Sequence, residues 1–295
     1  MIRIKNLTKD YGANKGVFDL SFEVQDAETF GLLGLKGAGK TTVLQILMGF
    51  AEASSGRCTV QAKNCWKQTV GIKCFTGYLP QQMAFPKRMT GIAFFRFLAR
   101  MRGQKSLESA IKTAEHFELD TSKKIERMSP EEKRELAICG VLLHDPQVLL
   151  LDEPDLDLGA NAQVRLMERI LEEKSRGKTI LICTEKLSTA ERMCDRIGIL
   201  KKGNLVNLDE VSAIRTACRK VFCISFQNEQ EAIRFVRQEN FEVLSKNGAQ
   251  LSVAFSGKVQ TFLEALSGYQ VLTLENIPQT LDETFSCLYG GDFHD

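Results

Sequence analysis

The sequence predicts an α/β fold with a mainly parallel sheet, followed by a smaller α+β domain. Up to about residue 208, apolar runs of strand length alternate with segments that are apolar at every third or fourth position. Strands buried on both faces read as continuous apolar runs, and helices with one buried face show the three- and four-residue spacing. After residue 208 the order becomes strand, helix, strand, strand, helix, strand. The alternation therefore predicts a parallel sheet covered on both sides, and the change of order predicts a second domain.

The first domain is expected to span residues 1–211. Its predicted strands are 2–4, 17–24, 29–35, 59–61, 77–79, 148–151 and 179–183, and its predicted helices are 41–48 and 161–174. The part after residue 90 reads as helices, because Phe94, Phe95 and Leu98 have helical spacing. These helices interrupt the alternation, so we expect an inserted helical subdomain at about 82–143.

The second domain is expected at 212–295, with a split βαβ, or ferredoxin-like, arrangement. Its predicted strands are 221–226, 241–244, 251–255 and 271–274, and its predicted helices are 229–237, 259–266 and 281–288. Asn247-Gly248 lies between two of these strands and is a hairpin-turn signal. No cluster of polar residues in this domain suggests chemistry, so we expect it to stabilise a dimer rather than to sense a ligand.

Composition excludes some classes of protein and leaves others open. The formal net charge of +2 argues neither for nor against a nucleic-acid partner. No apolar run approaches the roughly eighteen residues that cross a bilayer, and residues 1–6 lack the apolar segment of a signal peptide. The nine cysteines form no CxxC pair, so we expect buried free thiols in a reducing compartment and no metal site among them. We therefore expect a cytoplasmic protein that can dock on a membrane protein.

The segment 34–42, GLKGAGKTT, fits the phosphate-loop pattern G-x-x-x-x-G-K-[ST] and lies between a predicted strand and a predicted helix. Its glycines allow the backbone amides to turn inward around phosphates. Lys40 supplies a mobile charge for the β and γ phosphates, and the Thr41 hydroxyl can bind Mg²⁺, which takes few protein ligands. A structural glycine turn is the alternative, but it does not explain the spacing together with the flanking elements. The expected nucleotide-binding residues of the loop are Gly34, Leu35, Lys36, Gly37, Ala38, Gly39, Lys40, Thr41 and Thr42.

The segment VLLLDEP ends a predicted buried strand with Asp152 and Glu153. In open α/β sheets, ligands bind at the carboxyl ends of the strands. Asp152 can hold Mg²⁺ through water, and Glu153 can act as the general base toward an attacking water. An Asp-Glu pair is a weak signal alone, but it is a strong one downstream of a phosphate loop.

The phosphate loop and VLLLDEP, in this order over residues 1 to about 208, resemble the ATP-binding subunits of ABC transporters. The resemblance implies ATP and Mg²⁺ as cofactors, in a P-loop NTPase whose ATP hydrolysis drives transport. It also implies a multi-span membrane permease, which holds the subunit on the cytoplasmic face of the membrane, and a second ATP-binding subunit. The second domain and its tail LDETFSCLYGG resemble the small C-terminal domain of some export-type subunits, so we expect an exporter.

The resemblance assigns further positions outside the phosphate loop. Tyr11 stands where these subunits place an aromatic ring that stacks on adenine, with a packed edge tyrosine as the alternative. Gln81 corresponds to the glutamine that reaches Mg²⁺ and the attacking water, and Gln82 is the alternative in register. The segment 83–91 resembles the loop that contacts the membrane subunit, and the helices after it resemble the helical subdomain of the family.

One family motif is altered at residues 129–132. Ser129, Pro130, Glu131 and Glu132 stand where the family has a Ser-Gly-Gly-Gln signature, which caps the ATP held by the opposite subunit. Ser-x-x-Glu is instead a capping box, in which Ser129 and Glu132 each accept from the amide of the other, and Pro130 suits the first helical position. Each carboxylate near this helix start gains about 0.3 to 1 kcal/mol from the helix dipole, whereas a γ-phosphate would meet like charge. We therefore predict a well-capped helix and a poor phosphate clamp.

Other family positions are altered as well. Glu185 stands where the family has a histidine, and an ionised glutamate cannot donate to a γ-phosphate. Gly159 replaces an aspartate, for which Asp157 substitutes only if the loop shifts. Leu35 and Lys36 replace Pro-Asn inside the phosphate loop, where Lys36 either adds positive charge or points to solvent.

These departures lead to two hypotheses about the second subunit. In a heterodimer, a better-preserved ATPase subunit would supply the family residues that are altered here at 129–132, 159 and 185. A homodimer would instead bind ATP firmly and hydrolyse it slowly. A soluble ABC-type ATPase that acts on ribosomes or nucleic acid is an alternative function. Such proteins typically carry two ATPase cassettes or a long coiled-coil insertion, whereas this chain has one phosphate loop and no sustained heptads between Lys40 and Asp152. A regulatory subunit that does not hydrolyse ATP is another alternative, against which the retained Glu153 argues. We favour transport and expect no nucleic-acid partner.

Overall fold

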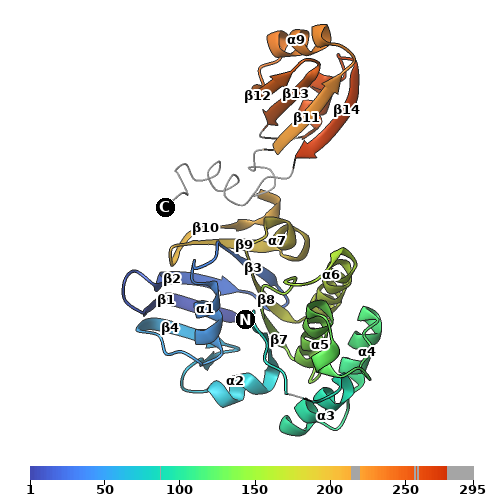
Figure 1. Cartoon of the computed structure of the whole chain (residues 1–295). Coiled ribbons are helices and arrows are strands. Elements are labelled where there is room, and N and C mark those ends of the chain that lie inside the picture. Colours follow the sequence, from blue (N-terminus) through green and yellow to red (C-terminus); the bar gives the residue numbers. More distant parts are fainter. Residues whose placement is uncertain (87, 214–219, 256, 258, 278–295) are drawn as a thin grey trace. The chain divides into compact units, whose positions relative to one another are not determined.

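The computed structural model describes residues 1–295 except 87, 214–219, 256, 258 and 278–295 (Figure 1). The chain forms two compact units, Met1–Val211 and Ser212–Asp295. The predicted helix 281–288 lies outside the described residues.

The larger unit is built around a six-stranded sheet in the order β10-β9-β3-β8-β7-β6 (Figure 1). Its strands are β3 Thr29–Leu33, β6 Thr76–Leu79, β7 Val148–Asp152, β8 Thr179–Thr184, β9 Arg196–Lys201 and β10 Asn204–Glu210. They pair in parallel, except that β10 is antiparallel to β9. All residues of β3, β7 and β8 are buried, as in strands covered on both faces. The predicted α/β class with a mainly parallel sheet is confirmed.

The strands at the start of the chain form a sheet of their own, in the order β2-β1-β4-β5. They are β1 Ile2–Asp10, β2 Gly16–Val24, β4 Ser55–Val60 and β5 Lys63–Asn64. Every pairing in this sheet is antiparallel. The turn between β1 and β2 is too short for the crossover that parallel pairing needs, so the two strands form a hairpin. The sequence did not predict this separate sheet.

One buried apolar cluster joins the two sheets and helix α1, Lys40–Leu47. Phe22 of β2 stacks on Phe30 of β3, with ring centroids 5.2 Å apart. Strand β3 ends at Leu33 rather than at residue 35, because a turn begins there in which the amide of Ala38 donates to the carbonyl of Leu35. The buried cysteines among the described free thiols are Cys58, Cys65, Cys139, Cys183 and Cys194, whereas Cys74 is exposed.

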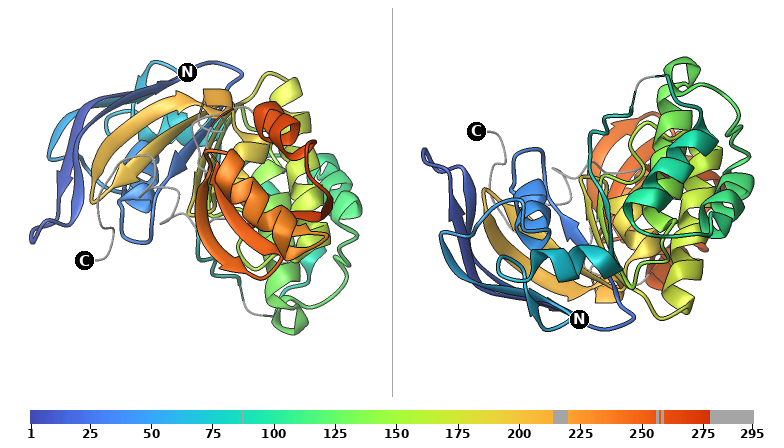
Figure 2. Two further views of the ribbon diagram at one scale, coloured as in Figure 1. Left: turned by 90° about the horizontal axis from the view of Figure 1, so that it is seen from above. Right: turned by 90° about the horizontal axis from the view of Figure 1, so that it is seen from below.

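The helical subdomain follows β6 and precedes β7. It contains α3 Gly91–Met101, α4 Glu108–Phe117, the 3-10 helix η1 Ile125–Arg127 and α5 Pro130–Leu142. Figure 2 shows these green helices gathered on one side of the larger unit. Helix α6, Ala160–Ser175, was also predicted, but α2, Thr69–Phe75, and α7, Leu187–Met193, were not. Each of the two missed helices has 7 residues, too few for helical spacing to stand out.

The smaller unit has an antiparallel sheet in the order β12-β13-β11-β14. Its elements are β11 Lys220–Phe226, α9 Glu229–Gln238, β12 Glu242–Asn247, β13 Gln250–Phe255, α10 Val259–Leu266 and β14 Val271–Ile277. One face of β11 packs against both helices, because Phe222 stacks on Phe262 at 4.9 Å between centroids and Phe226 lies 5.4 Å from Phe235. This connectivity and strand order are those of the predicted split βαβ arrangement.

Candidate functional site

Glycines shape the loop between β3 and α1. A Cβ on Gly34 would lie 2.5 Å from the carbonyl oxygen of Leu200, and a Cβ on Gly39 would lie 2.6 Å from Val17 Cγ1. Gly37 and Gly39 have φ of 86° and 108°, which other residues rarely adopt. Glycine is therefore required at 34 and 39 by the available space, and at 37 and 39 by the backbone conformation.

Lys40 begins α1 and is only 6% exposed. Its Nζ donates to the carbonyl oxygens of Gly34, at 2.6 Å, and Leu35, at 3.3 Å. The same Nζ pairs with Glu153 Oε1 at 3.2 Å and with Glu185 Oε1 at 3.3 Å. The Lys40 ammonium group, which the sequence predicts to bind phosphates, therefore forms ion pairs with two carboxylates in this structure.

The start of α1 and the end of β7 meet through their polar side chains. Thr41 Oγ1 donates to Asp152 Oδ2 at 2.8 Å, and the amide of Glu185 donates to Glu153 Oε2 at 3.1 Å. Burial raises the pKa of both Asp152 and Glu153, although the positive charge of Lys40 opposes the shift. Glu153 has φ of 46°, a left-handed conformation that is uncommon outside glycine. A buried carboxylate with a raised pKa is a better proton acceptor than an exposed one.

These side chains line one open cavity of about 370 Å³ in the larger unit. The lining residues are Tyr11, Asn14, Lys15, Gly16, Lys36, Gly37, Gly39, Lys40, Thr41, Thr42, Gln81, Asp152, Glu153 and Glu185. Of the two glutamine alternatives, Gln81 is a lining residue and Gln82 is not. Gly34, Leu35 and Ala38 belong to the loop but do not line the cavity. The fold thus brings most of the predicted nucleotide, metal and catalytic positions to one place.

The turn between β1 and β2 contributes residues that the sequence did not predict. Tyr11 is 53% exposed, and Lys9 Nζ lies 5.1 Å from its ring centroid. Asn14, Lys15 and Gly16 follow in the same turn and line the cavity with it. The only available signal was that a polar turn directly follows Tyr11, and polar turns are common on protein surfaces. An exposed ring at the edge of the cavity leaves a face free for stacking.

The altered signature segment forms the start of α5. Ser129 Oγ accepts from the amide of Glu132 at 3.1 Å, and Glu132 Oε2 accepts from the amide of Ser129 at 2.6 Å. Pro130 is the first residue of the helix. Lys123 Nζ pairs with the Glu132 carboxylate at 2.8 Å. The predicted capping box is confirmed, and its groups are satisfied within the chain.

Two of the altered positions contact each other. Glu131 Oε1 accepts from the amide of Gly159 at 2.9 Å. A Cβ on Gly159 would lie 3.1 Å from that same oxygen, so an aspartate there would crowd the contact. Asp157, the alternative to Gly159, is exposed and does not line the cavity. Neither residue therefore supplies a carboxylate to the cavity.

The donor set of the cavity fits a polyphosphate with Mg²⁺ at all but one position. Thr41 offers a hydroxyl, and Asp152 and Glu153 offer carboxylates, which are the hard oxygen ligands that Mg²⁺ prefers. Lys40 and the glycine loop supply positive charge and a backbone that can approach phosphates closely. Glu185 is the exception, because its carboxylate adds negative charge beside Lys40.

The fold and the phosphate loop define a P-loop nucleoside triphosphatase. The family model described as "ABC transporter" matches residues 17–156. An uncharacterized ABC transporter ATP-binding protein of Methanocaldococcus jannaschii is 34% identical over 240 residues, which cover 79% of this chain and 85% of that protein. The chain therefore belongs to the ABC transporter ATP-binding proteins, and it is an ABC-type ATPase.

Other relatives and solved structures agree with this assignment. The uncharacterized ABC transporter ATP-binding protein YhcH of Bacillus subtilis is 28% identical over 292 residues, covering 97% of this chain and 94% of the relative. A Nod factor export ATP-binding protein I of Rhizobium leguminosarum bv. viciae is 33% identical over 212 residues, covering 70% of this chain and 68% of the relative. A solved ATP-binding subunit of an ABC transporter is similar with a TM-score of 0.67 and 28% identity, covering 73% of this chain and 92% of that one.

Within the part of the chain that the structure describes, every helix is either too short or too polar to cross a membrane.

Proposed function

We propose that this subunit binds Mg-ATP and hydrolyses it to drive a membrane-embedded exporter. The observation that carries the proposal is the meeting of Lys40, Thr41, Asp152 and Glu153 in one cavity. The comparison with Nod factor export proteins supports the direction of transport, because those relatives are named for export. The arrangement combines the carboxyl end of β7 with the N-terminus of α1, and in such sheets phosphates bind at strand ends and helix N-termini.

Each lining side chain has a role in this proposal. Lys40 exchanges its contacts with Glu153 and Glu185 for the β and γ phosphates, and the exposed ring of Tyr11 stacks on the base. Thr41 and Asp152 would hold Mg²⁺, which would neutralise charge on the phosphate oxygens. Glu153 accepts a proton from the attacking water, and its raised pKa suits that task. Gln81 lies at the cavity wall, where its amide can orient that water.

The partners follow from the same proposal. A multi-span permease would hold the subunit at the cytoplasmic face of the membrane, and a second ATP-binding subunit would complete the ATPase. The contacts at Glu131, Gly159 and Glu185 favour a better-preserved second subunit, because the two carboxylates offer no donor to a γ-phosphate and Gly159 has no side chain. Purification of the native complex in detergent tests this choice by its stoichiometry. Two identical copies of this chain in one transporter would refute the heterodimer and leave a homodimer with slow hydrolysis.

Calorimetry with ATP and Mg²⁺ tests the core of the proposal. The full-length chain should bind the nucleotide, and the double variant Lys40→Ala/Thr41→Ala should lose at least about thirtyfold in affinity, because it lacks both the charge and the hydroxyl. Lys112→Ala is a matched control, since Lys112 is an exposed lysine of α4 outside the cavity. Equal affinity of the double variant and the wild type would refute the proposed site.

A further inference from the structure

Arg134 is a buried arginine of α5 whose hydrogen bonds all go to the main chain around the cavity. It is 4% exposed. An arginine has five N–H groups, and each Arg134 nitrogen donates to carbonyl oxygens. The contacts are Nη1 to Pro80 at 2.8 Å and Gln81 at 3.2 Å, Nη2 to Asp152 at 2.7 Å and Glu153 at 2.5 Å, and Nε to Pro154 at 3.4 Å.

The accepting carbonyls lie in the loop after β6, at the end of β7 and in the loop that follows β7. One loop follows β6 and carries Gln81, and the other follows β7 and carries Glu153. These strands are parallel neighbours in the central sheet, so their carboxyl ends lie side by side. Both side chains line the cavity, although Arg134 itself does not. A single guanidinium therefore ties together the two loops that carry the proposed catalytic residues.

The backbone at Glu153 needs such support. Its φ of 46° is a conformation that persists outside glycine only when the surroundings hold it. On one side, the amide of Glu153 donates to the carbonyl of Cys183 at 2.8 Å. On the other side, the carbonyl of Glu153 accepts from Arg134 at 2.5 Å. The peptide that directs the Glu153 side chain is thus fixed from both β8 and α5.

The charge of Arg134 also requires an explanation. A buried guanidinium is costly unless its donors are satisfied and negative charge lies near. Burial lowers the pKa of Arg134, and the carboxylates of Asp152, Asp157 and Asp155 oppose this shift. Because its direct partners are carbonyl dipoles, the guanidinium does not occupy the carboxylates of Asp152 and Glu153, which contact the cavity residues Thr41 and Lys40 instead. A carboxylate-paired arginine would have consumed one of these carboxylates.

We propose that Arg134 is a positioning residue for ATP hydrolysis, which holds Glu153 and Gln81 in register with each other. The inference rests on the proposed function, because it assigns Arg134 a task in that reaction. It also connects the altered signature segment to the reaction, since α5 begins at Pro130 and reaches the two loops through Arg134. A movement of the start of α5 is thereby passed to the peptides that carry the base and the glutamine.

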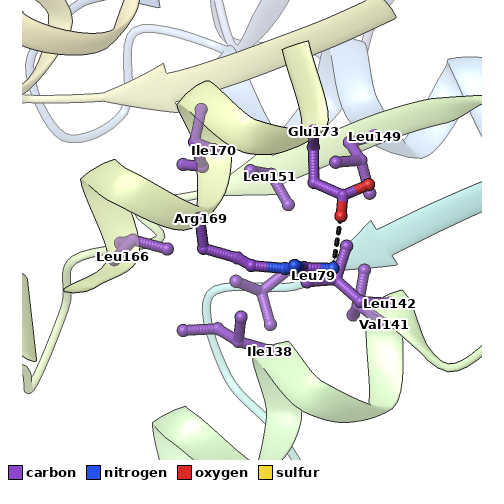
Figure 3. A pocket seen from close by; sticks show the side chains of 10 residues that line it. All are labelled: Leu79, Ile138, Val141, Leu142, Leu149, Leu151, Leu166, Arg169, Ile170 and Glu173. Atoms are coloured by element: carbon purple, nitrogen blue, oxygen red, sulfur yellow. Dashed lines mark ion pairs between the residues drawn. The ribbon is translucent and has the colours of Figure 1, made fainter. Parts of the chain in front are cut away.

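A second buried arginine offers a matched control. Arg169 of α6 is 5% exposed and forms ion pairs with Glu172 and Glu173. Figure 3 shows Arg169 beside Glu173 at a small cavity of about 20 Å³, among apolar side chains of α5, α6, β6 and β7. Its partners are carboxylates of its own helix and not the main chain of the catalytic loops. Loss of Arg169 therefore costs stability without moving Glu153.

The test compares Arg134→Gln, Arg134→Lys and Arg169→Gln in the full-length chain, by thermal unfolding, ATP calorimetry and steady-state hydrolysis. We expect Arg134→Gln to lower kcat about thirtyfold or more with the Kd for ATP within about threefold, because a small misplacement of a catalytic group is costly. Arg134→Lys, which keeps the charge and some donors, should recover part of kcat. Arg169→Gln should lower Tm and leave kcat within about twofold.

Several results would overturn the inference. A kcat within about twofold of wild type in Arg134→Gln, or a fall in kcat that only follows a fall in ATP affinity, would show that Arg134 does not position the base. If Arg134→Gln does not fold, the same criteria for kcat and ATP affinity apply to Arg134→Lys. If neither variant folds, Arg134 is required for folding and the inference of a positioning role is overturned. A wild-type chain that binds no ATP would instead overturn the proposed function, and this inference with it.

Discussion

The cavity and the start of α5 use their charged groups in opposite ways. Around the cavity, Lys40 and Asp152 face a space that is open to a ligand. At the start of α5, Glu131 and Glu132 are satisfied by amides of their own chain and by Lys123. The first region has groups that can bind a nucleotide, whereas the carboxylates of the second region are already hydrogen-bonded or ion-paired within the chain. Under the proposed function, the retained residues bind the nucleotide within the chain, and the altered residues lie where the family caps the nucleotide of the opposite subunit.

The largest expected effect tests the cavity side of this comparison. Glu153→Gln keeps the size of the side chain and removes the base, so ATP hydrolysis should fall about a hundredfold or more while ATP affinity does not weaken. Phosphate release at saturating ATP and calorimetry measure the two quantities. Glu115→Gln, at an exposed position of α4, is the control and should change neither. Hydrolysis by Glu153→Gln at the wild-type rate would show that the two regions do not differ in the proposed way.

The next effect tests the α5 side through its response to pH. Burial, and then the nearby Glu131, raises the pKa of Glu135 from an ordinary 4.5 to about 7. Between these values the folded chain keeps a proton that the unfolded chain has lost, so the free energy of unfolding decreases as pH rises. We expect Glu135→Gln to remove this decrease and to be about 2 kcal/mol more stable than wild type above pH of about 7.

Urea unfolding at several pH values between these limits measures the decrease. Glu115→Gln is again the control and should keep the wild-type dependence on pH, because its position is exposed. An unchanged dependence in Glu135→Gln would show that the pKa of Glu135 is not raised in the folded chain.

The smallest expected effect concerns an altered position that lies inside the cavity. Glu185 is an altered position, but its carboxylate pairs with Lys40 inside the cavity. Glu185→Gln removes a charge that competes with the γ-phosphate, so ATP should bind about fivefold more tightly, which is about 1 kcal/mol. ADP should gain less, because it lacks the γ-phosphate. Calorimetry with both nucleotides measures the gain in affinity. Equal or weaker ATP binding by the variant would show that the Glu185 carboxylate does not compete with the γ-phosphate.

The sequence predicted those parts of the fold and site that depend on local pattern. The strand before Asp152 is a continuous apolar run, and the capping box at Ser129 is a motif of adjacent residues. The separate antiparallel sheet was missed because apolar spacing does not say in which direction a strand will pair. Helices α2 and α7 were missed because each spans only 7 residues.

The contacts that were not predicted join residues far apart in the chain. Glu131 reaches the amide of Gly159, and Arg134 reaches carbonyls in two loops, so the acceptor or donor is a main-chain group that every residue has. No residue type marks such a partner in the sequence. The choice of Gln81 over Gln82 likewise came from the position of the loop relative to the cavity.

The strand order of the central sheet also constrains how the chain is made. Phe30 of β3 pairs with Leu181 of β8 and with Arg196 of β9, which the ribosome synthesises much later. The β1–β2 hairpin can close early, but β3 emerges as an apolar strand whose first edge stays unpaired until β8 has been translated and whose second edge stays unpaired until β9 follows. Chains that stop before Lys201 should therefore aggregate or require a chaperone, even when the complete phosphate loop is present.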